Sequence, residues 1–269
     1  MTKPSDIKLI LSLASEPGSS GYKMHNAGYK YLNLNYIYLP RLFLGNIKDA
    51  IESIRHLNIH GSSITMPYKI DASKYVDRLS KEAQIIGSIN TIVNKKGILY
   101  GYNTDAPASI KLIKDSFENK LFNGFHIIGS GGMARTFAYI SKKLNLKSQI
   151  TSKDKQKGLT IANQFDLEFL DFNSLSMVKN KIICNATPMC MNYQKNNIFD
   201  SIKQLNIENN FGVFDPVISD NNTWFVKECI QYNLPYVNGK QLSIEQAYLQ
   251  FELYTENKIP KFILENALE

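Results

Sequence analysis

Two polar segments in the first half of the sequence end in side chains that could move a proton. Lys69 closes the segment SITMPYK at 63–69, and Asp105 closes the segment YNTD at 102–105. A lysine beside a carboxylate can hold a proton and exchange it with a substrate hydroxyl, provided that both side chains reach that oxygen. Taken separately, Lys69 could be a solvated lysine that begins a helix, and Asp105 could cap the helix that follows it.

A glycine-rich turn carries a second chemical signal. The apolar segment FHII at 125–128 is followed directly by GSGGMA at 129–134 and then by a helical pattern over 133–144. Glycine lets the backbone turn tightly and approach a pyrophosphate, whose negative charge meets the N–H groups at the start of a helix. The spacing departs from G-x-G-x-x-G, so a plain tight turn remains an alternative.

The end of the next predicted strand bears on the choice of dinucleotide. An NAD site usually carries an acidic residue there for the ribose 2′-hydroxyl. The segment TSKDKQK at 151–157 instead holds three lysines, which suit a 2′-phosphate, together with Asp154. We therefore expect NADP as the cofactor, with NAD as the alternative that Asp154 leaves open.

The elements that must position these segments are read from hydrophobic periodicity. Residues 1–105 alternate short apolar runs with an amphipathic helix at 46–57, and the runs at 87–93 and 98–102 flank NKKG as a hairpin. Beyond residue 106 the pattern is strand–helix alternation, which indicates a parallel sheet with crossover helices. The segment after Gly239 is helical again. The predicted strands outside the hairpin are 8–13, 35–39, 59–65, 125–128, 148–151, 167–170, 181–184 and 212–214, and the remaining predicted helices are 25–32 and 109–117.

Bulk composition narrows the class of protein. A chain of 269 residues exceeds the usual single domain, so two α/β domains are expected. The net charge of +7 comes mainly from scattered lysines, since only four of the 31 basic residues are arginine, and this does not favour nucleic-acid binding. With no apolar run of membrane-spanning length and no signal-peptide pattern, we expect a cytoplasmic protein. The three cysteines, and His56 with His60, lack a convincing metal-ligand pattern, so no metal is expected.

Five motifs, in order and spread over most of the chain, resemble those of shikimate dehydrogenases. The N-T-P-K-like element of that family is similar to residues 64–69, its G-A-x-N-T to 87–91, and its G-x-N-T-D to 101–105. The N-A-T-P-x-G-M loop is similar to 185–191, and the closing Q-A-x-x-x-F-E-L helix to 246–253. The glycine turn and the segment 63–69 look more like the divergent shikimate dehydrogenase-like subgroup than the biosynthetic enzyme.

The resemblance implies a fold, a reaction and residue roles. It implies an N-terminal α/β substrate domain of residues 1–105 plus 239–269, and a Rossmann-like NADP-binding domain of residues 106–238. The reaction would be NADP-dependent interconversion of shikimate and 3-dehydroshikimate, in aromatic amino acid biosynthesis, by a monomer or homodimer. The implied catalytic pair is Lys69 and Asp105; the substrate-binding residues are Ser19, Thr65, Asn90 and Gln246; the cofactor-binding residues are Gly129, Gly131, Gly132, Met133, Ala134, Lys153, Thr187 and Gly239.

The chain departs from the family mainly where the substrate carboxylate would bind. The family's Ser-x-Ser pair before His25-Asn26 appears as Ser19 and Gly21, and the tyrosine of its D-x-x-Y-x-P segment is matched to Phe214. Cys190 replaces a glycine, and GKQLS at 239–243 replaces G-x-G-M-L. Two alternatives follow: a dehydrogenase for quinate or another hydroxy acid, and a non-catalytic nucleotide-sensing protein.

Overall fold

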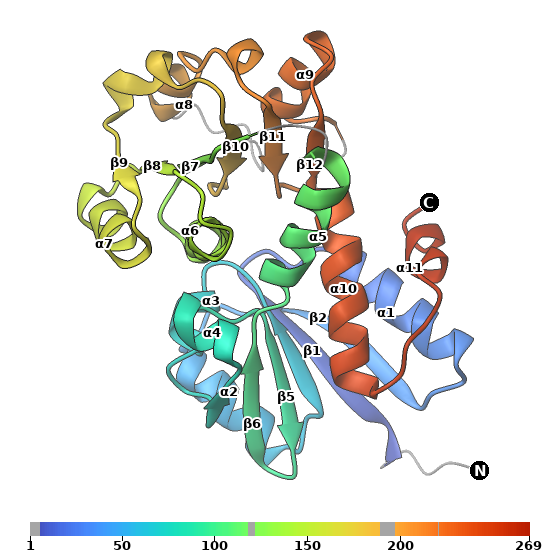
Figure 1. The fold of residues 1–269 in the computed structure, drawn as a ribbon. Coiled ribbons are helices and arrows are strands. Elements are labelled where there is room, and N and C mark those ends of the chain that lie inside the picture. The colour runs from blue at the N-terminus through green and yellow to red at the C-terminus, as the bar shows by residue number, and fades with distance from the viewer. Residues whose placement is uncertain (1–5, 118–121, 189–196, 220) are drawn as a thin grey trace. The chain divides into compact units, whose positions relative to one another are not determined.

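The computed structural model describes residues 6–117, 122–188, 197–219 and 221–269. The chain forms two compact units, one of Met1–Ala108 with Ser243–Glu269 and the other of Ser109–Leu242. It passes from one unit to the other within two helices, α5 (Asp105–Phe117) and α10 (Gly239–Thr255) (Figure 1). Each unit is therefore described by itself.

The first unit contains a mixed sheet with the strand order β2-β1-β3-β5-β6-β4. β1 pairs in parallel with β2 and β3, β5 pairs antiparallel with β3 and β6, and β4 is parallel to β6. The strands are β1 (Lys8–Ala14), β2 (Tyr36–Leu42), β3 (Gly61–Ile64), β4 (Arg78–Leu79), β5 (Thr91–Lys95) and β6 (Ile98–Tyr102).

Helices cover both faces of this sheet. Because side chains alternate along a strand, the neighbours Ile92 and Val93 of β5 point into two different apolar clusters. Val93 packs in the cluster that includes residues of α1 (Ser20–Tyr31), α10 and α11 (Phe262–Asn266). Ile92 packs in the cluster of the other face, whose helices are α2 (Ile47–His56), α3 (Lys69–Ala72) and α4 (Lys81–Ile86).

The predicted hairpin at 87–102 is confirmed, with a later start. Strands β5 and β6 pair antiparallel, but β5 begins at Thr91 rather than at Gly87. Gly87 has φ of +68° and ends α4, a helix that the sequence reading missed. Ser80 begins that helix by accepting a hydrogen bond from the backbone N–H of Ala83 at 3.2 Å. A capping serine and a left-handed glycine were the available signals.

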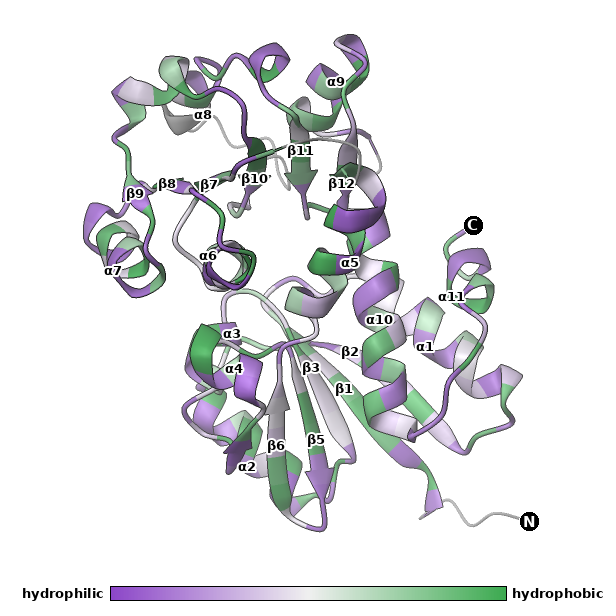
Figure 2. Ribbon diagram, in the orientation of Figure 1, coloured by the Kyte–Doolittle hydropathy of each residue, from purple (hydrophilic) through white to green (hydrophobic). Residues whose placement is uncertain are grey.

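The second unit contains a parallel sheet with the strand order β12-β11-β10-β7-β8-β9, as the strand–helix alternation predicts. Its central strands are buried, and Figure 2 shows β10 and β11 coloured largely as apolar. The strands are β7 (Phe125–Ile128), β8 (Gln149–Thr151), β9 (Glu168–Phe169), β10 (Ile182–Asn185), β11 (Gly212–Asp215) and β12 (Tyr236–Asn238). The α-helices besides α5 and α10 are α6 (Gly132–Lys143), α7 (Lys155–Phe165), α8 (Asn197–Ile202) and α9 (Trp224–Gln231), and two 3₁₀ helices span Phe172–Met177 and Ile207–Asn209.

The fold class is thus the expected one: α/β, in two units, with a parallel sheet in the second. Within the described residues, no helix has the length and apolar character required to cross a bilayer.

Candidate active site

Strand register brings the polar segments of the first unit to one end of its sheet. Ser63 at the end of β3 pairs with Thr91 at the start of β5, and Thr91 pairs with Tyr102 at the end of β6. The segments that continue from these three positions therefore begin side by side. They carry Lys69, Asn90 and Asp105, which the sequence places 15 or more residues apart.

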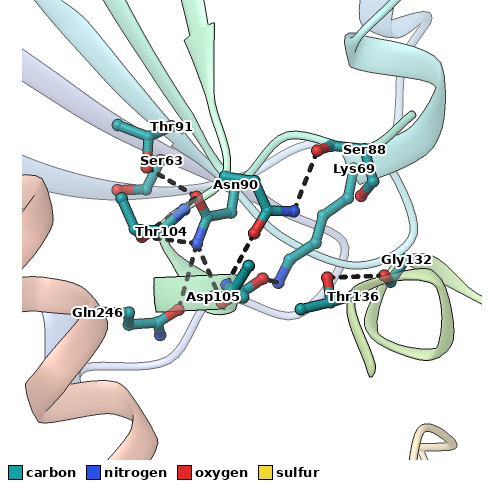
Figure 3. A network of polar contacts seen from close by, with 12 residues as sticks. Ser63, Lys69, Ser88, Asn90, Thr91, Thr104, Asp105, Gly132, Thr136 and Gln246 are labelled. Carbon is teal, nitrogen blue, oxygen red and sulfur yellow. Dashed lines mark hydrogen bonds and ion pairs between the residues drawn. The ribbon is translucent and has the colours of Figure 1, made fainter. Parts of the chain in front are cut away.

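Lys69 is the first residue of the short helix α3, and its side chain reaches Asp105. The Nζ atom donates to Oδ2 of Asp105 at 2.6 Å (Figure 3). The lysine side chain is 20% exposed and the aspartate side chain only 2%. The pair thus has one partly accessible member, the amine, and one member enclosed by protein.

Asp105 begins α5 but does not cap it. The cap is made by Asn103, whose Oδ1 accepts from the backbone N–H of Ala106 at 3.0 Å. The Nδ2 group of Asn103 donates to the Ser88 carbonyl at 3.0 Å, which holds the capping side chain in place. The alternative role of Asp105 as an N-cap is wrong, because Asn103 takes that role and leaves both carboxylate oxygens for other donors.

Asn90 is the hub of the polar network drawn in Figure 3. Its Oδ1 accepts from the backbone N–H of Thr104 at 2.9 Å, which fixes the orientation of the amide. Its Nδ2 then faces Asp105 Oδ1 at 3.0 Å, Thr104 Oγ1 at 2.9 Å and Gln246 Oε1 at 3.4 Å. Two hydrogens cannot serve three acceptors fully, so the longest contact, to Gln246, is the one that a ligand hydroxyl can replace most readily.

The other predicted substrate residues lie in the same unit. Thr65 follows β3 and is half-buried, while its backbone N–H donates to Leu13 O at 3.2 Å. Ser19 precedes α1 and is exposed, and its side chain makes no capping hydrogen bond. Asn90 contacts Asp105 directly, Gln246 contacts Asn90, and Thr65 lies four residues before Lys69 in the sequence. Ser19 keeps a free hydroxyl at the start of α1.

The space beside Gly21 is filled by a tyrosine. A Cβ atom at position 21 would lie 2.9 Å from the hydroxyl oxygen of Tyr38. Tyr38 is only 4% exposed, and its ring is stacked on that of His25 with centroids 4.5 Å apart. A serine side chain at position 21 consequently has no room while Tyr38 keeps its present position, because its Cβ would already be too close to the phenol hydroxyl.

In the second unit, the predicted phosphate turn joins β7 to α6 as expected for a strand–turn–helix unit. Gly129 has φ of +120°, and a Cβ there would meet the Ala186 carbonyl at 2.6 Å, so the turn itself requires glycine. Gly131 is different, because a Cβ at this position would meet no atom within 4 Å. The protein's own packing does not explain this glycine, and the open space at the start of α6 leaves room for a bound group. Gly132 and Met133 are half-buried and Ala134 is buried.

The charged residues in the turn after β8 differ in whether they already have a partner in the protein. Asp154 caps α7, since its carboxylate accepts from the backbone N–H of Lys157 at 3.1 Å and pairs with the Lys157 ammonium at 2.9 Å. These contacts hold the pKa of Asp154 below its ordinary value. Lys155 pairs with Asp171 at 3.3 Å. Lys153 is exposed and pairs with no residue in the described part of the chain, so it is the lysine available to a 2′-phosphate.

Thr187 and Gly239 have structural partners in the second unit. The N–H and Oγ1 of Thr187 donate to Asn185 Oδ1 at 3.0 and 2.7 Å. A Cβ at Gly239 would lie 2.4 Å from the backbone of Val217. Gly239 is therefore required by close chain packing, whatever else approaches it. Residues 189–191 of the same motif, including Cys190, lie outside the described residues.

The D-x-x-Y spacing places the family's tyrosine at a residue other than Phe214. Phe214 is fully buried and packs edge-on against Phe137 with ring centroids 5.0 Å apart, so a hydroxyl there would face the core. Asp215 stands at the first position of the spacing, and the third residue after it is Ile218, which is 48% exposed. The match to Phe214 is therefore wrong, and the hydroxyl that is missing belongs at Ile218.

Thr91 and Gln250, which the sequence analysis did not identify, support the Lys69–Asp105 pair through Asn90. Thr91 Oγ1 donates to Asn90 Oδ1 at 2.8 Å, and Gln250 Nε2 donates to Thr91 Oγ1 at 3.0 Å. Gln250 lies four residues, about one helical turn, after Gln246, and this spacing was the available signal. Among the described residues, no three His, Cys, Asp or Glu side chains are grouped closely enough to hold a metal ion.

Comparison with known proteins is consistent with this arrangement. Residues 18–92 match the family model described as the shikimate dehydrogenase substrate binding domain. A Methanosphaera stadtmanae protein named shikimate dehydrogenase (NADP(+)) is 33% identical over 250 residues, which are 89% of this chain and 87% of the relative. A Haemophilus influenzae protein named shikimate dehydrogenase-like is 32% identical over 255 residues, covering 94% and 92%.

A solved structure extends the likeness to three dimensions. A shikimate dehydrogenase in complex with NADP+ superposes with a TM-score of 0.84 at 27% identity, and the match covers 99% of this chain and 96% of that one. The expected kinship with the shikimate dehydrogenase-like subgroup is supported by the Haemophilus protein, which carries that description.

Proposed function

This chain belongs to the shikimate dehydrogenase family, and on that basis we propose that it is an NADP-dependent oxidoreductase that interconverts shikimate and 3-dehydroshikimate. The observation that carries the proposal is the 2.6 Å contact between Lys69 Nζ and Asp105 Oδ2. Two segments that are 36 residues apart supply one partly exposed amine and one enclosed carboxylate, which is the arrangement that proton transfer at an alcohol oxygen requires.

The pair handles the proton of the reaction. During oxidation, the substrate hydroxyl loses its proton to the Lys69–Asp105 pair, and during reduction the pair returns a proton to the carbonyl oxygen. Bound NADP supplies the hydride acceptor for the carbon that carries this oxygen. Asn90 keeps Asp105 in place through the 3.0 Å hydrogen bond from its Nδ2 group.

We assign substrate binding to polar groups around this pair. Gln246 and Asn90 bind ring hydroxyls, because their amide contact of 3.4 Å is long and exchangeable. Thr65 and Ser19 bind toward the acid end of the substrate. The substrate domain, implied at residues 1–105 with 239–269, corresponds to the first unit, and the cofactor domain, implied at residues 106–238, corresponds to the second unit, whose boundaries lie three and four residues later in the sequence.

The second unit offers a site that fits NADP. Gly129, Gly131, Gly132, Met133 and Ala134 hold the pyrophosphate at the start of α6, with the open space at Gly131 as the supporting observation. Lys153 binds the 2′-phosphate, and Asp154 does not compete for the ribose because it caps α7. Thr187 and Gly239 lie along the rest of the cofactor.

A second substrate class is favoured by a specific observation. Gly21 and Ile218 both lack a hydroxyl that the family pattern places near the substrate carboxylate. Each hydrogen bond to a charged group contributes about 1.5–3 kcal/mol, so two losses weaken carboxylate binding by roughly a hundredfold or more unless other groups compensate. Quinate or another cyclic hydroxy acid is therefore the alternative substrate.

A nicotinamide absorbance assay tests the proposal. The protein is given shikimate, quinate and related hydroxy acids, each with NADP and with NAD, and kcat/KM is compared. We expect turnover with NADP, and we expect Lys69→Met to lower kcat by about 100-fold or more while NADP binding is retained. Unchanged activity in Lys69→Met, or NADP binding with no turnover of any acid, would favour a nucleotide-sensing protein.

We propose a cytoplasmic location for the chain as well. The two described cysteines, Cys184 and Cys229, are free and buried, and reduced thiols are typical of that compartment. A monomer and a homodimer both remain compatible with the proposed reaction.

A further inference from the structure

We propose that Thr91 and Gln250 are positioning residues that join the buried His25 to Asp105 through a chain of hydrogen bonds, all donated in one direction. The inference rests on the proposed function in so far as Asp105 takes part in catalysis. Its members lie in the first unit and come from α1, α10, β5 with the residue before it, and the start of α5. Each of them is less than 7% exposed: His25, Gln250, Thr91, Asn90 and Asp105.

The donor-to-acceptor direction of this series of hydrogen bonds follows from groups that can only donate or only accept. Gln250 Nε2 lies 3.3 Å from the Asn90 carbonyl oxygen, which can only accept, so the amide nitrogen of Gln250 must face β5. Gln250 Oε1 then faces His25 Nε2 at 3.4 Å and Ser63 Oγ at 3.3 Å. The imidazole must therefore carry its proton on Nε2.

The remaining links continue the same direction. Thr91 Oγ1 accepts from Gln250 Nε2 at 3.0 Å, so it is free to donate its own proton to Asn90 Oδ1 at 2.8 Å. Asn90 Nδ2 donates to Asp105 Oδ1 at 3.0 Å. Hydrogen bonds in series polarise one another, and here each donor is strengthened toward the carboxylate at the end of the series.

The surroundings keep this series in one protonation state. His25 Nδ1 has no partner among the described residues, and burial lowers the His25 pKa to about 4, so the ring stays neutral with Nε2 protonated. The ring is flanked by Tyr38 and Tyr29 and by Phe251 and Tyr254 of α10. The ionisable side chain that pairs with Asp105 within the described residues is Lys69 of α3, whereas the uncharged Asn90 comes from the residue before β5 and the uncharged Gln246 from α10.

The series predicts how Asp105 responds when a link is lost. Thr91→Val keeps the shape of the side chain but removes the hydroxyl that donates to Asn90. A weaker Asn90 donor holds the Asp105 carboxylate less firmly opposite Lys69 Nζ, so the pair is less well placed for proton transfer. We expect kcat to fall roughly three- to tenfold while the KM for the hydroxy acid stays nearly unchanged.

The experiment compares four variants in the full chain. Thr91→Ser restores the hydroxyl and should restore kcat, and Gln250→Met, one link further away, should lower kcat by less. Thr255→Val is the matched control, because Thr255 is also buried in this unit but its hydroxyl donates to Phe251 O at 2.8 Å, outside the series. Thr255→Val should leave both kcat and KM unchanged.

A second measurement separates this inference from the proposed function. Nitrogen-15 NMR of the asparagine side-chain amides follows the Asn90 Nδ2 group without substrate or cofactor, and Thr91→Val should shift its resonance because the hydrogen bond to Asp105 weakens. If Thr91→Val and Gln250→Met leave both the Asn90 resonance and kcat unchanged, Thr91 and Gln250 are structural only and the inference is overturned. If the resonance shifts but the parent protein turns over no hydroxy acid, the proposed function fails while the hydrogen-bond series stands.

Discussion

At the residue scale, the site depends on which side chain takes the capping role. Asn103 caps α5, and this leaves Asp105 free to bind Lys69 and Asn90. The sequence alone offered Asp105 as a possible cap, since aspartate is favoured at that position. The acidic side chain two positions later is therefore available for chemistry because an uncharged neighbour does the structural work.

Gly21 provides a prediction at the same scale. Gly21→Ser places a Cβ 2.9 Å from the Tyr38 hydroxyl, and Tyr38 is buried with its ring stacked on that of His25. We expect the variant to lose about 1–3 kcal/mol of unfolding free energy, measured by urea denaturation, without a gain in kcat/KM for shikimate.

The companion variant for this prediction removes the obstructing atom. Gly21→Ser combined with Tyr38→Phe should recover part of the stability that Gly21→Ser loses relative to Tyr38→Phe alone. If Gly21→Ser by itself were as stable as the parent and more active on shikimate, then Tyr38 would not limit this position.

At the scale of elements, the turn from β8 to α7 shows which of its charged side chains already have partners. Asp154 is used by the backbone and by Lys157, Lys155 is used by Asp171, and Lys153 remains exposed. The capping of α7 therefore leaves one lysine of this segment, Lys153, as the candidate for binding the 2′-phosphate. The sequence could count these charges but could not assign them, because the capping geometry is set by where α7 begins.

Lys153 therefore gives an element-scale prediction. We expect Lys153→Ala to raise the KM for NADP about tenfold, because one charged hydrogen bond is lost, and to leave the KM for NAD nearly unchanged. Asp154→Asn is the control, since asparagine also caps helices, and it should leave the preference for NADP intact. Steady-state kinetics with both cofactors checks this; equal effects of Lys153→Ala on NADP and NAD would contradict it.

At the scale of the whole molecule, each unit encloses a neutral histidine. Burial lowers the pKa of His25 in the first unit and of His126 in the second unit to about 4, from an ordinary value of 6.5. The unfolded chain binds protons at these positions below pH 6.5, whereas the folded chain does so only near pH 4. The contribution of these neutral rings to the free energy of unfolding is therefore fully present above about pH 6.5 and is lost as the pH falls toward 4.

This linkage predicts the pH dependence of stability. A fully buried histidine with this shift is expected to remove about 3 kcal/mol of unfolding free energy between pH 6.5 and 4. His126→Gln should flatten the fall in stability, and His56→Gln, which alters an exposed ring, should not. Urea denaturation at pH 7 and near pH 4.5 measures the slopes; equal slopes in His126→Gln and in the parent would contradict the account.

The sequence by itself determined the local structure and the kinds of chemistry available. Hydrophobic periodicity predicted the hairpin of β5 and β6, the parallel sheet, and the strand–turn–helix at Gly129, because each depends on residues within a few turns or strands of one another. The ordered motifs predicted the family and named Lys69 and Asp105.

Only the tertiary structure decided which side chains meet. The register between β3, β5 and β6 brings Lys69 to Asp105, and the docking of α10 brings Gln250 to Asn90 across 160 residues of sequence. The same is true of Tyr38 beside Gly21 and of the buried ring at Phe214. Such contacts depend on strand order and helix packing, which arise from burial summed over a whole unit, so no short stretch of sequence contains them.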